Sequence, residues 1–163
     1  DANYVRESHI KEYPVRSKRS ARLHSSFESM FYEETSLSLP DTSLEDQLTN
    51  IGPSFHDKLF ELIDKSHLDN KDVWKRANLD RKLFSKIQCN KNYHPKKKTV
   101  LALCIALELN LEESKDLLAR ADWAFSPSSK VDLIVQKAII DKQYDIMELN
   151  ITLFKYTNET LGI

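Results

Sequence analysis

From residue 54 onward, apolar residues recur every three or four positions, the period of helices that bury one face. In the first such segment Phe55, Leu59 and Leu62 share a face, and this helix is predicted to end near His67. Seven helices are predicted in all, and no segment shows the strict alternation of a strand. The predicted fold class is therefore all-α.

A tight turn is predicted between the second and third helices. Asp69 and Asp80 stand where a capping side chain is expected at the start of each helix. Between them Asn78 and Leu79 reverse the chain, and asparagine accepts the left-handed conformation that such a turn needs better than most residues. Two short helices joined in this way form a helix-turn-helix unit.

The fourth predicted helix is apolar on nearly every side, which is typical of a helix at the centre of a bundle. Leu101 and Ile105 within it, and Phe84 of the third helix, are expected to be nearly fully buried. This helix is predicted to end near Leu109.

Three more helices follow. Asn110 and Glu113 have the spacing of a capping box at the start of the fifth, and the last two begin near residues 126 and 145. The first of these two, from Ser128 to about Asp141, is apolar on more than one side, so it needs a cover, either the last helix or a second copy of the chain. The residues expected at such a homodimer interface are Ile139, Ile140, Leu149, Leu153 and Phe154.

Residues 1–50 differ from the rest of the chain. They hold a short basic run from Arg16 to Arg22, then an acidic stretch rich in serine and threonine, with no sustained apolar period. Such a composition predicts a largely disordered linker. The predicted organisation is this linker, a helix-turn-helix domain over residues 51–125, and a C-terminal helical extension over 126–163 that packs on it.

Charge is distributed unevenly along the chain. Between Lys71 and Lys98 there are ten basic and two acidic residues, a net charge of +8, whereas the whole chain has a net charge of −1. The remaining residues therefore carry −9. A positive segment that coincides with a helix-turn-helix unit favours an anionic partner there. The alternative is a solvated basic surface without a partner.

Patterns of catalytic and metal-binding residues are not found in the sequence. The five histidines have no ligand spacing that repeats, and Cys89 and Cys104 lack metal or redox spacing. The two glycines, Gly52 and Gly162, are too few for a phosphate-binding loop. No apolar run is long enough for a membrane helix, and there is no signal-peptide pattern. We expect no enzymatic activity, no cofactor, no membrane partner and a cytoplasmic location.

From Leu59 to Leu118 the sequence resembles the Xre-type, lambda-repressor-like helix-turn-helix family. The residues of the recognition segment that fit the family pattern are Leu79, Asp80, Phe84, Ser85, Lys86 and Ile87. Two positions depart from it. The family usually has a small residue at Trp74 and glycine at Asn78. The Trp74 ring is expected either to separate the two helices or to be pushed outward.

The resemblance implies a bacterial transcriptional regulator that binds double-stranded DNA, with the third helix in the major groove. The implied DNA-binding residues are Asn70, Arg81, Lys82, Ser85, Lys86, Lys91, Lys96, Lys97 and Lys98. Arg81, Lys82, Ser85 and Lys86 would meet base edges, and the other lysines would meet phosphates. Since regulators of this family commonly read two half-sites, a homodimer is expected. The alternative is a protein-interaction or assembly module that keeps the fold without binding DNA.

A second resemblance concerns the layout of the whole chain. The opening Asn3-Tyr4-Val5, the basic run, the acidic linker and the helical block are similar to the C-terminal half of bacterial proteins with an N-terminal macro domain. The chain itself contains no macro domain, so no ADP-ribose chemistry is expected.

Overall fold

The computed structural model describes residues 42–162, which fall into two parts that are treated separately. Residues 42–50 contain the short helix α2 (Leu44–Thr49), where the Ser43 hydroxyl accepts the backbone N–H of Asp46 at 3.2 Å. This helix was not predicted. The rest of the predicted linker, residues 1–41, lies outside the described residues.

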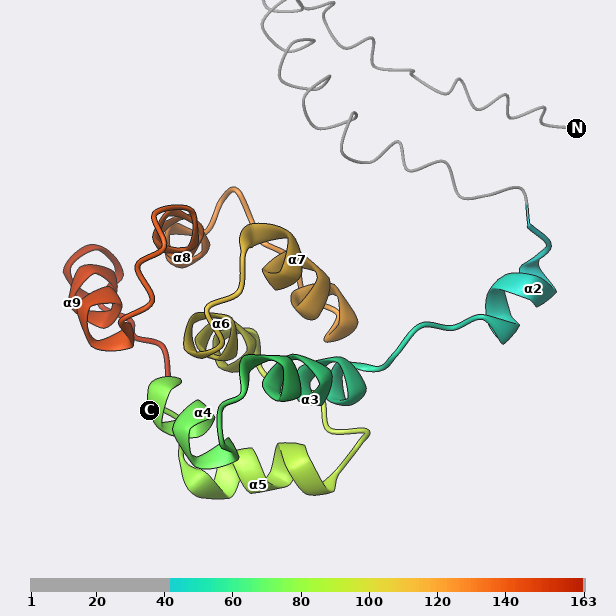
Figure 1. The fold of residues 1–163 in the computed structure, drawn as a ribbon. Coiled ribbons are helices and arrows are strands. Elements are labelled where there is room, and N and C mark those ends of the chain that lie inside the picture. The colour runs from blue at the N-terminus through green and yellow to red at the C-terminus, as the bar shows by residue number, and fades with distance from the viewer. Residues whose placement is uncertain (1–41, 163) are drawn as a thin grey trace, which may run out of the picture. The chain divides into compact units, whose positions relative to one another are not determined.

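Residues 51–162 are helical, and the described residues contain no strand, which confirms the all-α class. All seven predicted helices are present (Figure 1). They are α3 (Phe55–Ser66), α4 (Asn70–Arg76), α5 (Arg81–Cys89), α6 (Lys97–Ala106), α7 (Leu111–Arg120), α8 (Lys130–Ile140) and α9 (Ile146–Thr157).

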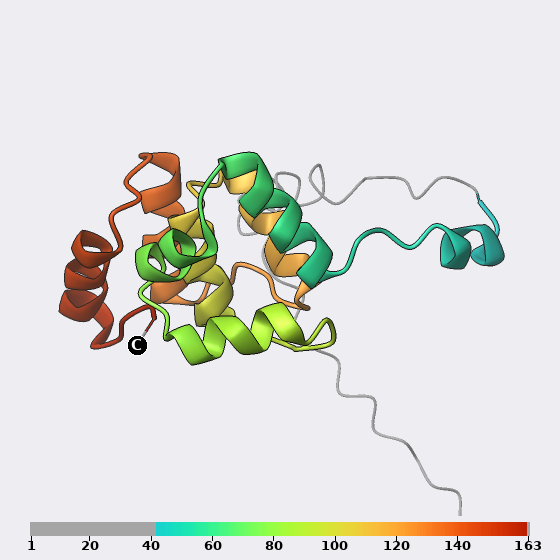
Figure 2. The same cartoon turned by 60° about the horizontal axis from the view of Figure 1, so that its bottom comes forward.

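Helix α6 lies at the centre of this part, as predicted. Every residue from Thr99 to Ala106 is buried, so the helix must be covered on all sides. Helices α4, α7 and α9 pack directly on it, α3 packs on α7, and α8 contacts both α7 and α9 (Figures 1 and 2). Leu101 and Ile105 are fully buried and Phe84 is 2% exposed, which confirms the expected core.

Four helices end in the same left-handed turn. At the end of α4, the Leu79 N–H donates to the Trp74 carbonyl at 2.9 Å and the Asn78 N–H donates to the Lys75 carbonyl at 3.0 Å. This pair of bonds is the Schellman motif, and α6, α7 and α8 repeat it. The left-handed residues are Asn78, Glu108, Asp122 and Lys142. Glycine is the usual residue at this position, yet none of the four is glycine.

The turn at Glu108 ends α6 at Ala106, earlier than the predicted end near Leu109. Asn110 then starts α7 with the predicted capping box. The Glu113 N–H donates to Asn110 Oδ1 at 2.8 Å, and the Asn110 N–H donates to Glu113 Oε2 at 3.2 Å. The polar groups at both helix ends therefore find partners within a few residues.

Helices α8 and α9 share the core of the other helices. Ile139, Leu149 and Leu153, which were expected at an interface between copies, are buried within one chain, so that part of the prediction is wrong. Their helical spacing turns them inward, onto the core that α6 and α7 also line. Ile140 and Phe154, by contrast, are 60% and 59% exposed.

The C-terminal segment packs beside the turn between α4 and α5. Leu161 is fully buried, and the Asn150 side chain bonds to its N–H at 2.8 Å and to its carbonyl at 3.0 Å. Gly162 has a φ of 79°, and a Cβ there would lie 2.2 Å from the Asn78 carbonyl oxygen. Only glycine fits this approach, so the segment after α9 lies directly against the turn between α4 and α5.

The left-handed turn after α8 predicts opposite effects for two substitutions of the exposed residue Lys142. Lys142→Gly removes a steric cost of roughly 1–2 kcal/mol and adds about 0.5–1 kcal/mol of backbone entropy cost. The free energy of unfolding, measured with urea, should therefore be unchanged or slightly higher. Lys142→Val should lower it, because a β-branched side chain is strained at positive φ. Equal stability of the two variants would contradict the left-handed turn.

Candidate nucleic-acid interface

Helices α4 and α5 pack on each other and are joined by residues 77–80. The inward side chains of this unit are Val73, Ala77, Leu79, Phe84 and Ile87, all buried. Asp69 and Asp80 hold the predicted N-cap positions, but neither side chain makes a capping hydrogen bond. Because the unit is anchored from one side only, the other side of α5 faces outward (Figures 1 and 2).

Four of the predicted site residues come together on the outer face of α5. Arg81, Lys82, Ser85 and Lys86 are exposed and line one shallow, open hollow, with Cys89 at its end. Their spacing places them on one side of the helix. Within residues 42–162 no carboxylate forms an ion pair with Arg81, Lys82 or Lys86. This face therefore offers three unneutralised cations and a hydroxyl to an anionic ligand.

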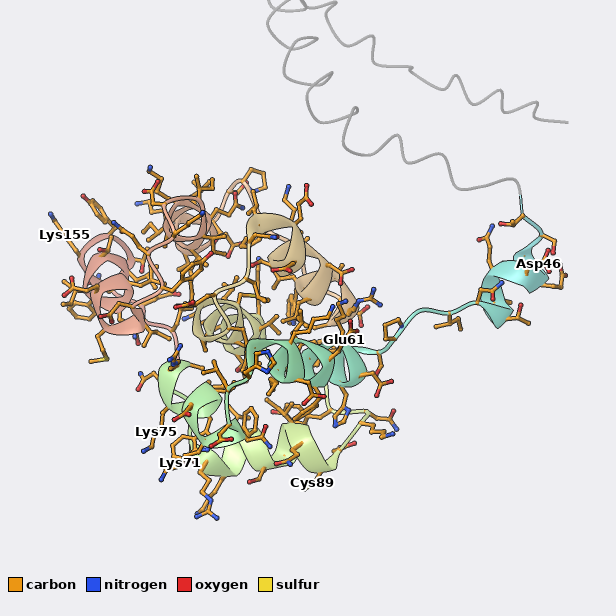
Figure 3. The ribbon with its side chains drawn as sticks, in the orientation of Figure 1. Asp46, Glu61, Lys71, Lys75, Cys89 and Lys155 are labelled. Atoms are coloured by element: carbon orange, nitrogen blue, oxygen red, sulfur yellow. The ribbon has the colours of Figure 1, made fainter. Side chains whose placement is uncertain are left out.

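Helix α4 adds two lysines that were not among the predicted site residues. Lys71 and Lys75 are exposed, and their side chains extend from α4 on the side where α5 lies (Figure 3). Their i, i+4 spacing, visible in the sequence, places both on one face of the helix. Asn70, which was predicted, is the first residue of α4 and is half-buried.

Trp74 is half-buried and packs against the edge of the core. Since α4 and α5 still contact each other, the ring does not separate them and lies partly outward instead. The Lys75 ammonium lies 5.9 Å from the centroid of this ring. Trp74 thus contributes both to the core and to the surface beside α5.

The lysines after α5 do not form one set. Lys91 and Lys96 are exposed. Lys97, however, donates to the carboxylate of Asp132 on α8, which is buried and also accepts the Ser126 N–H at 2.7 Å.

Lys98 forms an ion pair with Glu159 at 2.7 Å, and both of these side chains are about half exposed. Lys97 and Lys98 therefore hold α6 to α8 and to the C-terminal segment. The neighbouring loop is fixed as well. The Trp123 indole N–H donates to the Pro95 carbonyl at 2.9 Å, and the His94 ring lies 5.7 Å from the Trp123 ring.

The two cysteines differ in their surroundings. Cys104 is buried in α6, and burial raises the pKa of its thiol to about 12, so it remains protonated and unreactive at neutral pH. Cys89 is exposed at the end of the α5 face. Across residues 42–162, no group of three histidine, cysteine or acidic residues is arranged to bind a metal ion. Of the helices described, none has both the length and the apolar character that crossing a membrane requires.

Comparisons of the chain with known protein families, curated proteins and solved structures give no match. The function of the chain is therefore inferred from the geometry of α4 and α5.

Because Lys97 forms an ion pair with Asp132, Lys97→Ala should lower the stability of the fold, whereas Lys96→Ala should not. Lys97→Ala leaves Asp132 buried without its cation. The Lys97 side chain is 23% exposed, so water reaches it in part. The loss of unfolding free energy should lie between the ~0–1 kcal/mol of an exposed pair and the ~3–5 kcal/mol of a buried one. Lys96→Ala is the control and should stay within about 0.5 kcal/mol of wild type. Equal stability of both variants would show that the pair does not anchor α8.

Proposed function

We propose that residues 51–162 form a lambda-repressor-like helix-turn-helix module that binds double-stranded DNA through α5 and acts in the regulation of transcription. The observation that carries this proposal is the outer face of α5, where Arg81, Lys82, Ser85 and Lys86 are exposed side by side and have no acidic partner among residues 42–162. A basic surface that only contacts water would not require these cations to gather on the second helix of a helix-turn-helix unit.

The dimensions of α5 suit the major groove. Its nine residues make a helix about 13 Å long that projects from one side of the module. The groove is about 12 Å wide and admits one helix. The residues near the N-terminus of a recognition helix meet base edges, and here these are Arg81 and Lys82. Both side chains can donate hydrogen bonds to guanine O6 and N7.

Phosphate contacts come from residues around α5. Lys71 and Lys75 on α4, and Lys91 and Lys96 after α5, are exposed and suited to the DNA backbone. The Asn70 side chain, in the first turn of α4, would donate to a phosphate as well. Lys97 and Lys98 are left out of the proposed contact, because carboxylates of the same chain already hold them.

A protein-interaction module is the second candidate function. It is favoured by the half-buried Trp74 ring and by the apolar side chains that α8 and α9 expose. The two functions differ in their dependence on salt, because only DNA binding releases the counterions condensed on a duplex.

Two classes of substitution should separate in a DNA-binding assay. Arg81→Ala and Lys82→Ala should weaken binding to a selected site by about 1–3 kcal/mol and weaken binding to random duplex much less. Lys96→Ala should weaken both about equally and lower the slope of log affinity against log salt by about one. Electrophoretic shifts at two salt concentrations, with a site selected from random duplexes, measure both effects.

Lys97→Ala is not a suitable phosphate variant, since it also removes an ion pair within the fold. Lys130→Ala, at the exposed first residue of α8, is the matched control and should change neither affinity nor slope. Absence of salt-dependent binding to any duplex would overturn the proposal and favour the interaction module.

Cys89 gives an independent test of the same face. It is the exposed one of the two cysteines, so a bulky thiol reagent at neutral pH should modify Cys89 and leave Cys104 unmodified. The adduct would lie in the hollow beside Lys86 and should reduce DNA binding at least about tenfold, equivalent to about 1.4 kcal/mol. Cys89→Ser should bind like wild type and resist the reagent. Full binding by the labelled wild-type chain would exclude this end of α5 from the interface.

A further inference from the structure

The exposed apolar side chains of the helical part are concentrated at its C-terminal end. Helices α3 to α7 expose no large apolar side chain to the extent that α8 and α9 do. The exposed ones on α8 and α9 are Leu133, Ile140, Met147, Ile151, Phe154 and Tyr156. Large exposed apolar patches are uncommon on monomeric soluble proteins, and where they occur they mark contacts with partners.

Three of these residues form a stripe along α9. Met147, Ile151 and Phe154 follow the i, i+4, i+7 spacing of one helix face and are 59–65% exposed. We refer to these three residues as the α9 stripe. Another face of the same helix carries the buried residues Ile146, Leu149 and Leu153. Helix α9 is therefore apolar on two faces, and residues 51–162 cover only one of them.

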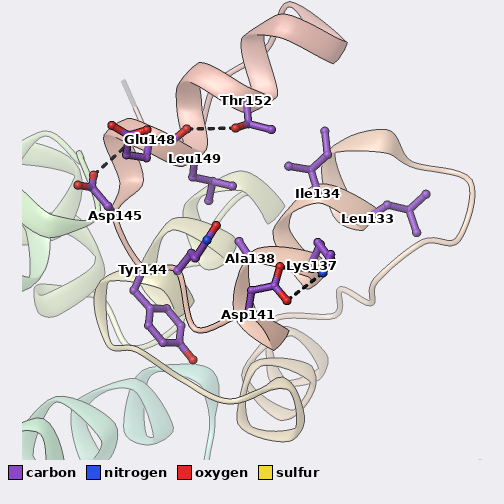
Figure 4. A pocket seen from close by; sticks show the side chains of 11 residues that line it. Leu133, Ile134, Lys137, Ala138, Asp141, Tyr144, Asp145, Glu148, Leu149 and Thr152 are labelled. Atoms are coloured by element: carbon purple, nitrogen blue, oxygen red, sulfur yellow. Dashed lines mark hydrogen bonds and ion pairs between the residues drawn. The ribbon is translucent and has the colours of Figure 1, made fainter.

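The stripe is distinct from the hollow between α8 and α9. That hollow, of about 600 Å³, has apolar walls that include Ile134 and Ala138, and the ion pair of Lys137 and Asp141 lies at its edge (Figure 4). Helix α9 lines it with Glu148, Leu149 and Thr152, none of which belongs to the stripe. A ligand in the hollow would leave the stripe exposed.

The charged residues beside the stripe can pair with the same residues of a second copy of the chain. Glu148 and Lys155 lie seven residues apart along one edge of it, and within residues 42–162 neither forms an ion pair. The Lys155 ammonium lies 5.3 Å from the centroid of the Tyr156 ring. If two α9 helices pack antiparallel about a two-fold axis near Ile151, Glu148 faces Lys155 of the partner subunit at both ends.

We propose that the α9 stripe is the interface of a homodimer in which the two α9 helices pack antiparallel. Ile151 then packs on its symmetry mate, and Met147 packs on Phe154 of the partner subunit. This surface differs from the one expected from the sequence, since Ile139, Leu149 and Leu153 are interior. The inference does not depend on DNA binding, because the dimer is measured without DNA.

Sedimentation of the full chain at micromolar concentration tests the interface. A species of twice the 19.0 kDa chain mass is expected. Ile151→Glu should shift it to the monomer while circular dichroism keeps its helical signal. Leu48→Glu, at a similarly exposed apolar position on α2, is the control and should remain dimeric. A wild-type monomer at every concentration would overturn the proposal and leave the stripe to a different partner. A dimer that survives Ile151→Glu would overturn the choice of surface.

A charge exchange tests the antiparallel arrangement without touching apolar residues. Glu148→Lys alone, or Lys155→Glu alone, should raise the dimer dissociation constant roughly tenfold, since each change replaces two attractive contacts with repulsive ones. The double variant should restore the wild-type constant to within about twofold, as expected for restored pairs. Single variants that match wild type, or a double variant as weak as the single ones, would overturn the antiparallel pairing. This readout also holds if Ile151→Glu fails to fold.

Discussion

The structure depends on the burial of α6. Eight consecutive residues of this helix, Thr99 to Ala106, have no solvent-facing side, so other helices must enclose it completely. Helices α4, α7 and α9 contact it directly, which brings segments from both ends of the helical part onto one core. The extension formed by α8 and α9 is in this sense part of the fold. Leu153 of α9 is as fully buried as Leu101 of α6.

The same constraint leaves the outer side of α5 exposed. The helices that enclose α6 are α4, α7 and α9, and α5 is not one of them. Helix α5 is held from one side only, through its buried residues Phe84 and Ile87. Phe60 of α3 meets Phe84 edge to face with the ring centroids 6.2 Å apart, and the ring of His56 bonds to the Gln88 carbonyl at 3.0 Å. These contacts fix the orientation of α5 while its polar residues remain on the surface. A helix positioned in this way can present side chains to a groove without moving.

Local signals were sufficient to predict most of the fold. The helical period gave the seven helices, Asn110 and Glu113 gave the capping box, and Asn78 gave a left-handed turn. The similar turns at Glu108, Asp122 and Lys142 were not foreseen, because none of these residues is the glycine that usually marks such a turn in a sequence. Helix α2 was missed because its six residues are too few to show a period.

The candidate site was predictable only in part, since charge along a sequence does not show which cations have partners in space. The outward residues of α5 followed from the period of the helix and from its buried neighbours Phe84 and Ile87. Lys97 looked like its neighbours in the sequence, but Asp132, which neutralises it, lies 35 residues away. The same limit applied to the last two helices. Their apolar faces were recognised, but whether the chain itself covers each face depends on long-range packing.

The burial of α6 has a consequence for the dynamics of the molecule. Its amide hydrogens can exchange with solvent only when the surrounding helices separate, which is equivalent to unfolding the whole core. The amides of α5 can exchange through a smaller opening, because that helix is packed on one side. The free energy of the opening that permits amide exchange is therefore expected to be higher for α6 than for α5.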